Sequence, residues 1–237
     1  MENIDYDSLK RRGFLRQKQE AFFVVRLRKA YGNYASIDLE NIKSIADQFG
    51  RGLVHATTRQ GLEIPYIKYE DIALVEAKAK QTGLETGTSG PRLRTTTVCP
   101  GNNWCKSGLV NTFEFYQRIE NELGIKCAMD LPHKFKIVIS GCPNTCTRAQ
   151  QSEIGLHGAV DLADPKKNIG WQVYLGGCGG KTPRLALKLE KIYNENEALR
   201  IIARVVKFFK DNAKPKQRLA LLIEEVGRER FLKEVLE

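Results

Sequence analysis

The alternation of hydrophobic and polar residues in the first 85 positions predicts a small α+β unit. Five elements follow one another in this part of the chain: a strand at 22–27, a helix at 37–49, strands at 53–58 and 62–67, and a helix at 71–81. The first helix places four apolar residues on one face: Ile37, Ile42, Ile45 and Phe49. The order of the elements predicts an antiparallel sheet with helices on one side, preceded by a charged arm or short helix over residues 1–20.

A stretch rich in glycine, threonine and serine at 82–90 marks the predicted boundary between two domains. We place these domains at residues 1–85 and 86–237. The second domain contains predicted strands at 134–140 and 171–175, with helical patterns at 112–123, 185–211 and 215–237. The predicted fold class is therefore α+β, with a helical C-terminus.

The composition is typical of a folded protein that lies outside the membrane. Hydrophobic residues make up 42% of the 237 positions, which is enough to bury a core. The longest apolar runs, at 137–139 and 219–223, are far too short to span a bilayer. The N-terminus is acidic and lacks the layout of a secretory signal. We expect a cytoplasmic location, where reducing conditions favour metal or redox roles over disulfides for the six cysteines.

Four of the six cysteines form two close pairs. Cys99 and Cys105 lie six positions apart, and Cys142 and Cys146 lie four apart, each pair in a loop that begins Cys-Pro. Four thiolates can hold a tetrahedral zinc ion or an iron–sulfur cluster. Structural zinc sites favour two to four intervening residues, so the five residues between Cys99 and Cys105 favour a cluster. Two further cysteines lack a close partner and are predicted to be structural: Cys127 and Cys178.

The net charge of +10 indicates anionic partners, and the spacing of the basic residues indicates which kind of anion is bound. Three basic pairs are separated by one residue, so that each pair would point to one face of a strand: Arg26 and Arg28, Arg92 and Arg94, and Lys134 and Lys136. Two of these pairs shortly precede the cysteine loops. Because crowded like charges are costly unless an anion neutralises them, the pattern predicts a polyanionic ligand beside the metal.

Together these motifs resemble the siroheme-containing sulfite and nitrite reductases. The cluster signature of that family is Cys-x5-Cys followed by Cys-x3-Cys, which the two cysteine pairs match. Further motifs of the family occur in the expected order: Arg28, Thr57-Thr-Arg-Gln60, Arg94, Lys134-Phe-Lys136, Ile154-Gly-Leu-His-Gly158 and Gly176-Gly177. The resemblance runs from about residue 20 to about residue 190, and implies a ferredoxin-like half domain followed by a domain that binds siroheme and a [4Fe–4S] cluster.

The resemblance also implies roles for individual residues. Cys146 would bridge the cluster to the siroheme iron, whose other face would bind sulfite and reduce it to sulfide. Four cations would ring the substrate, neutralise its charge and relay protons: Arg28, Arg94, Lys134 and Lys136. Six other residues would contact the siroheme, whose many carboxylates would attract the positive charge: Arg26, Thr57, Thr58, Arg59, Gln60 and Asn144.

The chain departs from the family pattern in three respects. The residues Lys29-Ala-Tyr-Gly32 stand where the family usually has a turn rich in glycine and proline, and Glu153 replaces the usual aspartate before Ile154. Larger members contain two copies of the half domain and catalytic unit and this chain has one, so that the second copy is either supplied by self-association into a homodimer or dispensed with. No cysteines remain for an additional ferredoxin module, which implies an external, ferredoxin-like electron donor attracted by the basic surface.

Three alternatives stay open. A siroheme nitrite reductase producing ammonia would use the same centre, although the two lysines of Lys134-Phe-Lys136 favour the more highly charged sulfite. A non-catalytic siroheme carrier would be expected to lack some of the four substrate cations. A zinc-ribbon protein that binds nucleic acid would suit the charge and the four cysteines, but no aromatic residues alternate with the basic ones to stack on bases. We therefore expect no nucleic-acid partner.

Overall fold

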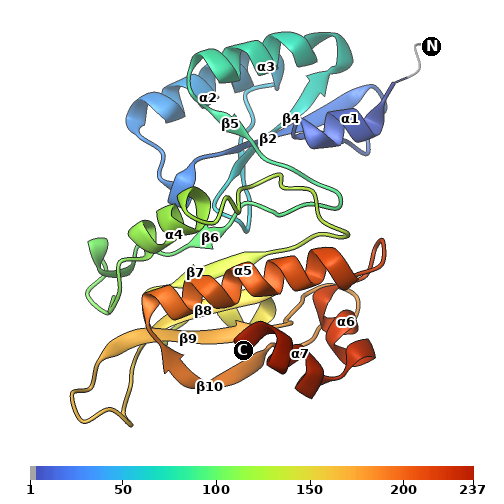
Figure 1. Cartoon of the computed structure of the whole chain (residues 1–237). Helices are drawn as coiled ribbons and strands as arrows, with labels where there is room; N and C mark the ends of the chain where they lie inside the picture. The colour runs from blue at the N-terminus through green and yellow to red at the C-terminus, as the bar shows by residue number, and fades with distance from the viewer. Residues whose placement is uncertain (1–3) are drawn as a thin grey trace. The chain divides into compact units, whose positions relative to one another are not determined.

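In the computed structural model, which describes residues 4–237, the chain forms two units that divide between Gly90 and Pro91 (Figure 1). The first unit contains three helices and five strands among its described residues: α1 (Tyr6–Arg11), β1 (Phe14–Arg16), β2 (Phe22–Arg28), α2 (Ser36–Phe49), β3 (His55–Ala56), β4 (Leu62–Lys68), α3 (Ile72–Gln81) and β5 (Glu85–Thr86). Short 3-10 turns at Ala30–Gly32 and Tyr69–Asp71 complete it.

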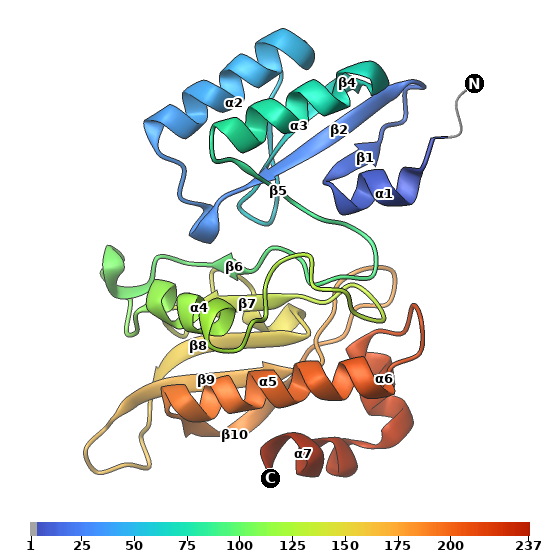
Figure 2. The same cartoon turned by 45° about the horizontal axis from the view of Figure 1, so that its top comes forward.

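The sheet of the first unit is antiparallel throughout, with the order β1-β2-β4-β3 and with β5 also paired to β2. The helices α2 and α3 lie side by side against this sheet (Figure 2). Buried and half-buried residues alternate along β2, with Phe23, Val25 and Leu27 in the core. Arg26 and Arg28 therefore share the opposite face of the strand, as their spacing predicts.

One predicted helix face needs correction. Ile42 and Ile45 of α2 are buried, but Ile37 is 59% exposed. Ile37 lies in the first turn of the helix, one residue after Ser36, where the helix has only begun to follow the sheet. The N-terminal arm also contains β1 in addition to the predicted short helix, because Phe14 pairs with Val25 and fills the core.

The second unit contains eleven described elements: β6 (Thr97–Val98), a 3-10 turn (Gly101–Asn103), α4 (Thr112–Asn121), β7 (Ile137–Ser140), a 3-10 turn (Ala149–Gln151), β8 (Ile154–Val160), β9 (Ile169–Leu175), β10 (Leu187–Tyr193), α5 (Glu195–Asn212), α6 (Leu219–Val226) and α7 (Arg228–Leu236). Its mixed sheet has the order β10-β9-β8-β7-β6, in which β6, β7 and β8 are parallel and the rest antiparallel.

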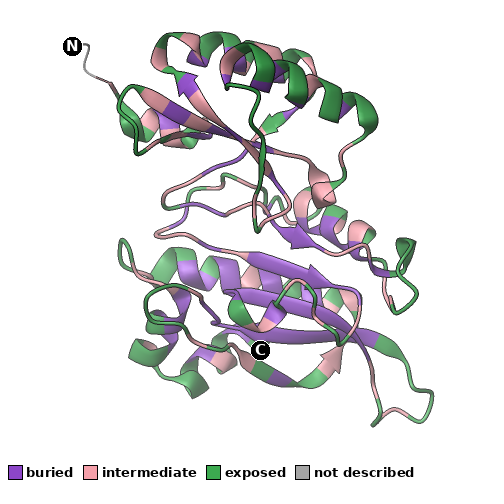
Figure 3. Cartoon of the chain, turned by 180° about the vertical axis from the view of Figure 1, so that it is seen from behind, coloured by how far each residue is buried: buried purple, intermediate pink, exposed green. Residues whose placement is uncertain are grey.

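Helices α4 and α5 lie across one face of this sheet (Figures 1 and 2). The ring of Phe115 on α4 stacks on Trp171 of β9 at 4.1 Å, and Phe209 on α5 packs against Phe135 at 5.0 Å. β8 and β9 are buried along almost their whole length, as the colouring of Figure 3 shows. The predicted α+β class with a helical C-terminus is confirmed.

Part of the predicted helix at 185–211 is wrong. Residues Leu187–Tyr193 form the edge strand β10, which pairs with β9, and the helix begins only after Asn194. The side chain of Asn194 accepts a hydrogen bond from Glu197 N at 3.0 Å while Glu197 accepts one from Asn194 N at 2.8 Å. This capping box fixes the start of α5. Gly227, at φ 89°, likewise divides the predicted helix at 215–237 into α6 and α7.

No helix among residues 4–237 is both long and apolar enough to cross a membrane.

Candidate functional site

The two cysteine pairs lie at the same edge of the second sheet. Cys99 directly follows β6, and Cys142 follows β7 with one residue, Gly141, between them. Because these two strands are adjacent and parallel, their carboxyl ends lie at the same edge of the sheet. The two loops are hydrogen-bonded to each other through sulfur: Gly141 N donates to Cys99 Sγ at 2.9 Å, and Gly101 N donates to the same atom at 3.4 Å. The structure therefore brings together two loops that are 42 positions apart in the sequence.

Glycines allow this close approach. A Cβ atom added to Gly141 would lie 2.4 Å from Gly101 Cα, and one added to Gly108 would lie 2.2 Å from the carbonyl carbon of Gly101. Leu109 N also donates to Gly141 O at 2.8 Å. The backbones of the two cysteine loops are thus in direct contact, which leaves no room for side chains at these positions.

The thiols differ in exposure. Cys105 and Cys146 are exposed, whereas Cys99 and Cys142 are half-buried. Burial raises the pKa of the Cys99 thiol, the amides of Gly101 and Gly141 lower it, and the neighbouring Cys142 and Cys146 raise it. Backbone N–H groups aimed at a sulfur stabilise it as a thiolate, which is the form that binds metal.

Four cysteine thiols on two adjacent loops are the donor set of a four-cysteine iron–sulfur cluster. Within residues 4–237, no group of three or more His, Cys, Asp or Glu side chains is arranged so that it could hold a metal ion. Each of the remaining two cysteines has a polar atom nearby: Cys127 lies 3.7 Å from Thr95 Oγ1, and Cys178 is buried and lies 3.7 Å from Thr182 O.

The predicted cations of the second unit lie on two paired segments. Leu93 and Phe135 form a parallel bridge, with Arg94 N donating to Phe135 O at 2.9 Å. Both apolar side chains are fully buried, so the alternation along each segment places Arg94, Lys134 and Lys136 on the opposite face, where all three are half-buried. Arg92, which precedes Leu93, forms an ion pair with Asp130 at 3.0 Å.

The cations and the thiols occupy different ends of the same strands. Arg94 and Lys136 precede β6 and β7, whereas the cysteines follow them. Four residues lie between Arg94 and Cys99, so at about 3.3 Å per extended residue the chain between the two spans at most roughly 17 Å. Within this unit the cations therefore lie on the segments that lead into the strands, and the cysteines on the loops that leave them.

In the first unit, the predicted residues lie on β2 and on the turn before β4. Arg26 forms an ion pair with Glu63 at 3.1 Å, and Arg28 pairs with Glu85 of the adjacent strand β5. Thr57 shapes the turn, because its Oγ1 accepts hydrogen bonds from Arg59 N at 3.4 Å and Gly61 N at 3.2 Å.

Four further predicted siroheme contacts complete the set. Thr58 is exposed beside the half-buried Arg59, and Gln60 follows at φ 59°. In the second unit, Asn144 is exposed between Cys142 and Cys146.

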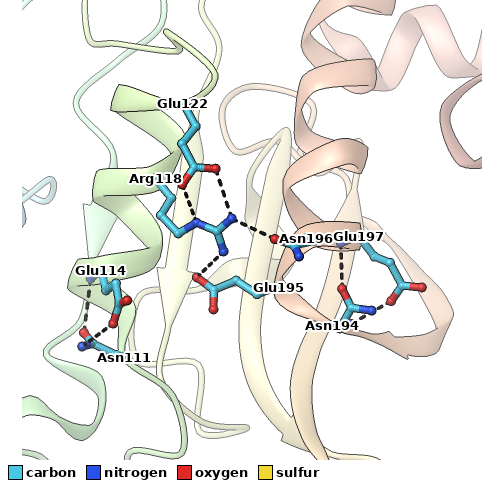
Figure 4. Close-up of polar contacts among 8 residues, drawn as sticks. All are labelled: Asn111, Glu114, Arg118, Glu122, Asn194, Glu195, Asn196 and Glu197. Atoms are coloured by element: carbon cyan, nitrogen blue, oxygen red, sulfur yellow. Dashed lines mark hydrogen bonds and ion pairs between the residues drawn. The ribbon is translucent and has the colours of Figure 1, made fainter.

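Helix α4, which follows the first cysteine loop, contacts the start of α5 through a network of hydrogen bonds and ion pairs (Figure 4). Arg118 binds Glu122 at 2.7 Å, Glu195 at 3.1 Å and Asn196 at 2.8 Å. The hydrogen bonds with Glu122 and Glu195 raise the pKa of Arg118. The N-cap of α4 is Asn111, whose side chain accepts from Glu114 N at 3.2 Å.

Sequence reasoning missed two charged residues next to the cation segments. Glu153, noted only as a departure from a motif, is completely buried and pairs with Arg218 just before α6. Arg218 carried no signal of its own in the sequence, since it is one of 38 lysines and arginines. A buried carboxylate requires a partner, so Glu153 could have prompted a search for one.

Comparison with known families gives two matches. The family model described as "Nitrite and sulphite reductase 4Fe-4S domain" matches residues 89–237, and "Nitrite/Sulfite reductase ferredoxin-like half domain" matches residues 15–81.

Curated relatives are similar over most of the chain. A coenzyme F420-dependent sulfite reductase of Methanocaldococcus jannaschii is 30% identical, covering 95% of this chain and 44% of that protein. An assimilatory ferredoxin-dependent nitrite reductase of Haloferax mediterranei is 28% identical, covering 83% and 36%. An assimilatory-type sulfite reductase of Nitratidesulfovibrio vulgaris is 26% identical, covering 95% and 97%. The chain thus spans less than half of the first two relatives and almost all of the third.

Solved structures share the fold. The Mycobacterium tuberculosis NirA protein superposes with a TM-score of 0.81 at 21% identity, covering 100% of this chain and 47% of that one. Dissimilatory sulfite reductase I superposes with a TM-score of 0.78 at 16% identity, covering 90% and 69%.

Proposed function

The chain belongs to the nitrite and sulphite reductase 4Fe-4S family, and we propose from this premise that it reduces sulfite to sulfide. As the sequence predicts, it is an oxidoreductase of a family whose cofactors are siroheme and a [4Fe–4S] cluster. The family assignment replaces the zinc-ribbon alternative. We propose sulfite as the substrate, and we further propose the kind of electron donor and the roles of individual residues.

The observation that carries the proposal is the contact between the two cysteine loops. Gly141 N donates to Cys99 Sγ, so the loops that carry the two pairs share one edge of the sheet. In the proposal, Cys99, Cys105, Cys142 and Cys146 would hold the cluster, and the exposed Cys146 would also bind the siroheme iron. When bound, the two groups would relay electrons from an external donor to the iron at which the oxyanion is reduced.

The protein side chains provide charge and protons. Arg28, Arg94, Lys134 and Lys136 bind the oxygens of sulfite and offset its negative charge, and the lysine Nζ atoms hold protons for the oxygens that leave as water. The fixed backbone pairing of Leu93 with Phe135 supports this role, because it keeps the charged side chains in place before the substrate arrives. A second set binds the carboxylates of siroheme: Arg26, Thr57, Thr58, Arg59, Gln60 and Asn144.

Nitrite is the second candidate substrate. Relatives that carry the name nitrite reductase match this chain at 26–30% identity, the same range as the relatives named sulfite reductase. Lys134 and Lys136 favour sulfite in the proposal, because two ammonium groups suit an oxyanion of higher charge. The near-complete coverage of the assimilatory-type sulfite reductase also supports sulfite.

The electron donor in the proposal is an acidic, ferredoxin-like protein. A net charge of +10 favours such a partner. Trp104, which is 66% exposed and packs edge-on against Phe113 at 5.3 Å, offers an apolar contact directly beside the exposed Cys105. Association of two copies of the chain is a further part of the proposal, since some relatives are more than twice as long.

An anaerobic assay on the purified holoprotein tests the proposal. The visible spectrum should contain the Soret and red bands of siroheme, and reduced methyl viologen should support formation of sulfide from sulfite. The ratio of kcat/KM for sulfite to kcat/KM for nitrite, with sulfide and ammonia quantified, distinguishes the two candidates. A higher kcat/KM for nitrite would contradict the choice of sulfite, and a spectrum without siroheme bands would contradict the coupled centre.

A further inference from the structure

A buried ion pair lies next to the strand segment that carries Lys136. The side chain of Glu153 is 0% exposed, and that of Arg218 is 12% exposed. Glu153 Oε1 accepts from Arg218 Nε at 2.7 Å and also from Nη2. The second oxygen, Oε2, accepts from the backbone N–H of Lys136 at 3.0 Å. One carboxylate thus connects Arg218 with the backbone of Lys136.

The C-terminal part of the chain holds the same segment at two other points. Lys216 N donates to Pro132 O at 3.1 Å, and the ring of Phe209 packs on Phe135 at 5.0 Å. On its other side, Phe135 pairs with Leu93 of the segment that carries Arg94. The segment at 132–136 therefore lies between the Arg94 segment and residues contributed by α5 and the connection to α6.

The surroundings of this pair are strongly basic. Burial lowers the pKa of His133, and four cations lower it further: Lys134, Arg218, Arg94 and Lys216. Burial raises the pKa of Glu153, while Arg218 and Lys136 lower it. Like charges in such a group repel one another, so the segment needs an anchor that keeps Lys134 and Lys136 in place when no anion is bound. The carboxylate of Glu153 is positioned to be that anchor.

We infer that Arg218 and Glu153 are positioning residues for Lys134 and Lys136. Arg218 fixes the Glu153 carboxylate with a two-nitrogen fork, and the carboxylate fixes the Lys136 amide, so that both lysines present their Nζ atoms in a constant arrangement. The connection between α5 and α6 is in this way a part of the substrate site, although no catalytic motif lies in it. The relevance to substrate rests on the proposed function.

The test compares Arg218→Gln with Arg184→Gln in the holoprotein. Arg184 forms an ion pair with Glu224 of α6, the helix that follows Arg218, but its partners are 32% and 54% exposed, so this pair is a matched control that does not reach the segment. Partners that orient a functional group typically contribute ten- to a hundredfold. We expect Arg218→Gln to raise the KM for sulfite about tenfold with a smaller change in kcat, and Arg184→Gln to leave both unchanged.

Hydrogen exchange gives a readout that does not depend on turnover. In Arg218→Gln, the peptide containing the Lys136 amide should exchange faster, while peptides of the buried strand β9 keep their protection. The visible spectrum should stay that of the parent, and Arg218→Lys, which restores a cation without the fork, should give intermediate values of KM and exchange.

Unchanged exchange at Lys136, or faster exchange with an unchanged KM for sulfite, would overturn the inference. If Arg218→Gln does not fold, the decision passes to Arg218→Lys, for which parental exchange together with a parental KM has the same consequence. Normal sulfite turnover by Lys136→Ala would instead contradict the proposed function, and would leave the exchange result standing.

Discussion

At the scale of single residues, the role of Lys136 can be tested most directly, because its backbone is fixed by hydrogen bonds and its cationic side chain is half-buried. Its N–H donates to Glu153 and its C=O accepts from Ile154 N at 3.1 Å, so truncating the side chain should not disturb the strand. We expect Lys136→Ala to lower kcat/KM for sulfite about a hundredfold, the usual effect of removing one preorganised donor. The visible spectrum should stay that of the parent. Lys166→Ala, at an exposed position before β9, is the control and should keep parental kinetics.

Cys146 is the second residue whose role can be isolated. Its thiol is exposed at the end of the second cysteine loop, where a bridge between cluster and siroheme requires access from outside. Cys146→Ser should abolish the coupled electron paramagnetic resonance and visible signature and reduce iron and siroheme content, because serine is a poorer ligand for iron–sulfur clusters. Cys127→Ser changes a thiol whose sulfur lies 3.7 Å from Thr95 Oγ1, and should retain both cofactors. A coupled spectrum in Cys146→Ser would mean that another cysteine forms the bridge.

At the scale of elements, the cluster site depends on contact between two loop backbones. Gly141→Ala would place a Cβ atom 2.4 Å from Gly101 Cα, so one of the loops must move. We expect a loss of about 1–3 kcal/mol in the free energy of unfolding and a lower iron and sulfide content per chain. Gly179→Ala is the matched control, because nothing lies within 4 Å of its added Cβ atom. Parental iron content in Gly141→Ala would show that the loops tolerate separation.

The elements also show which parts of the fold can be predicted from the sequence. The strand at β2 and the helices α2, α3 and α4 follow clear periodicities, and the cysteine spacing and paired cations are visible without coordinates. The edge strand β10 was misread as helix because Leu187, Leu189, Ile192 and Tyr193 also suit a helical repeat, and only pairing with β9 decides between them. The pairing of Leu93 with Phe135 joins segments 42 positions apart, and no local pattern encodes it.

The candidate site was predictable in its residue types and much less in its arrangement. Spacing indicates that Arg94, Lys134 and Lys136 share strand faces and precede the cysteine loops, but it does not reveal that β6 and β7 are adjacent and parallel, so that both loops leave the same edge of the sheet. The contacts from Arg218 through Glu153 to Lys136 depend on the tertiary packing of the α5–α6 connection, and for this reason no sequence motif predicts them.

At the scale of the whole molecule, the positive charge and the position of Trp104 bear on how electrons enter. Cys105 is exposed, and its neighbour Trp104 packs edge-on against Phe113 of α4 but remains 66% exposed. Exposed aromatic side chains at such positions are frequent anchors of protein–protein contacts. A protein donor needs this docking contact, whereas a small reductant reaches the cluster by diffusion alone.

Trp104→Ala separates these two routes of reduction. We expect kcat/KM for a reduced bacterial ferredoxin to fall about tenfold, because truncating an aromatic anchor commonly costs more than about 1 kcal/mol of binding free energy, while the rate with reduced methyl viologen stays parental. Leu162→Ala, at a residue 81% exposed between β8 and β9, is the control and should affect neither rate. Equal losses with both reductants would place the defect in the cluster itself, and in that case the electron paramagnetic resonance spectrum of Trp104→Ala should differ from that of the parent. A loss confined to the ferredoxin reaction would locate electron entry at the first cysteine loop.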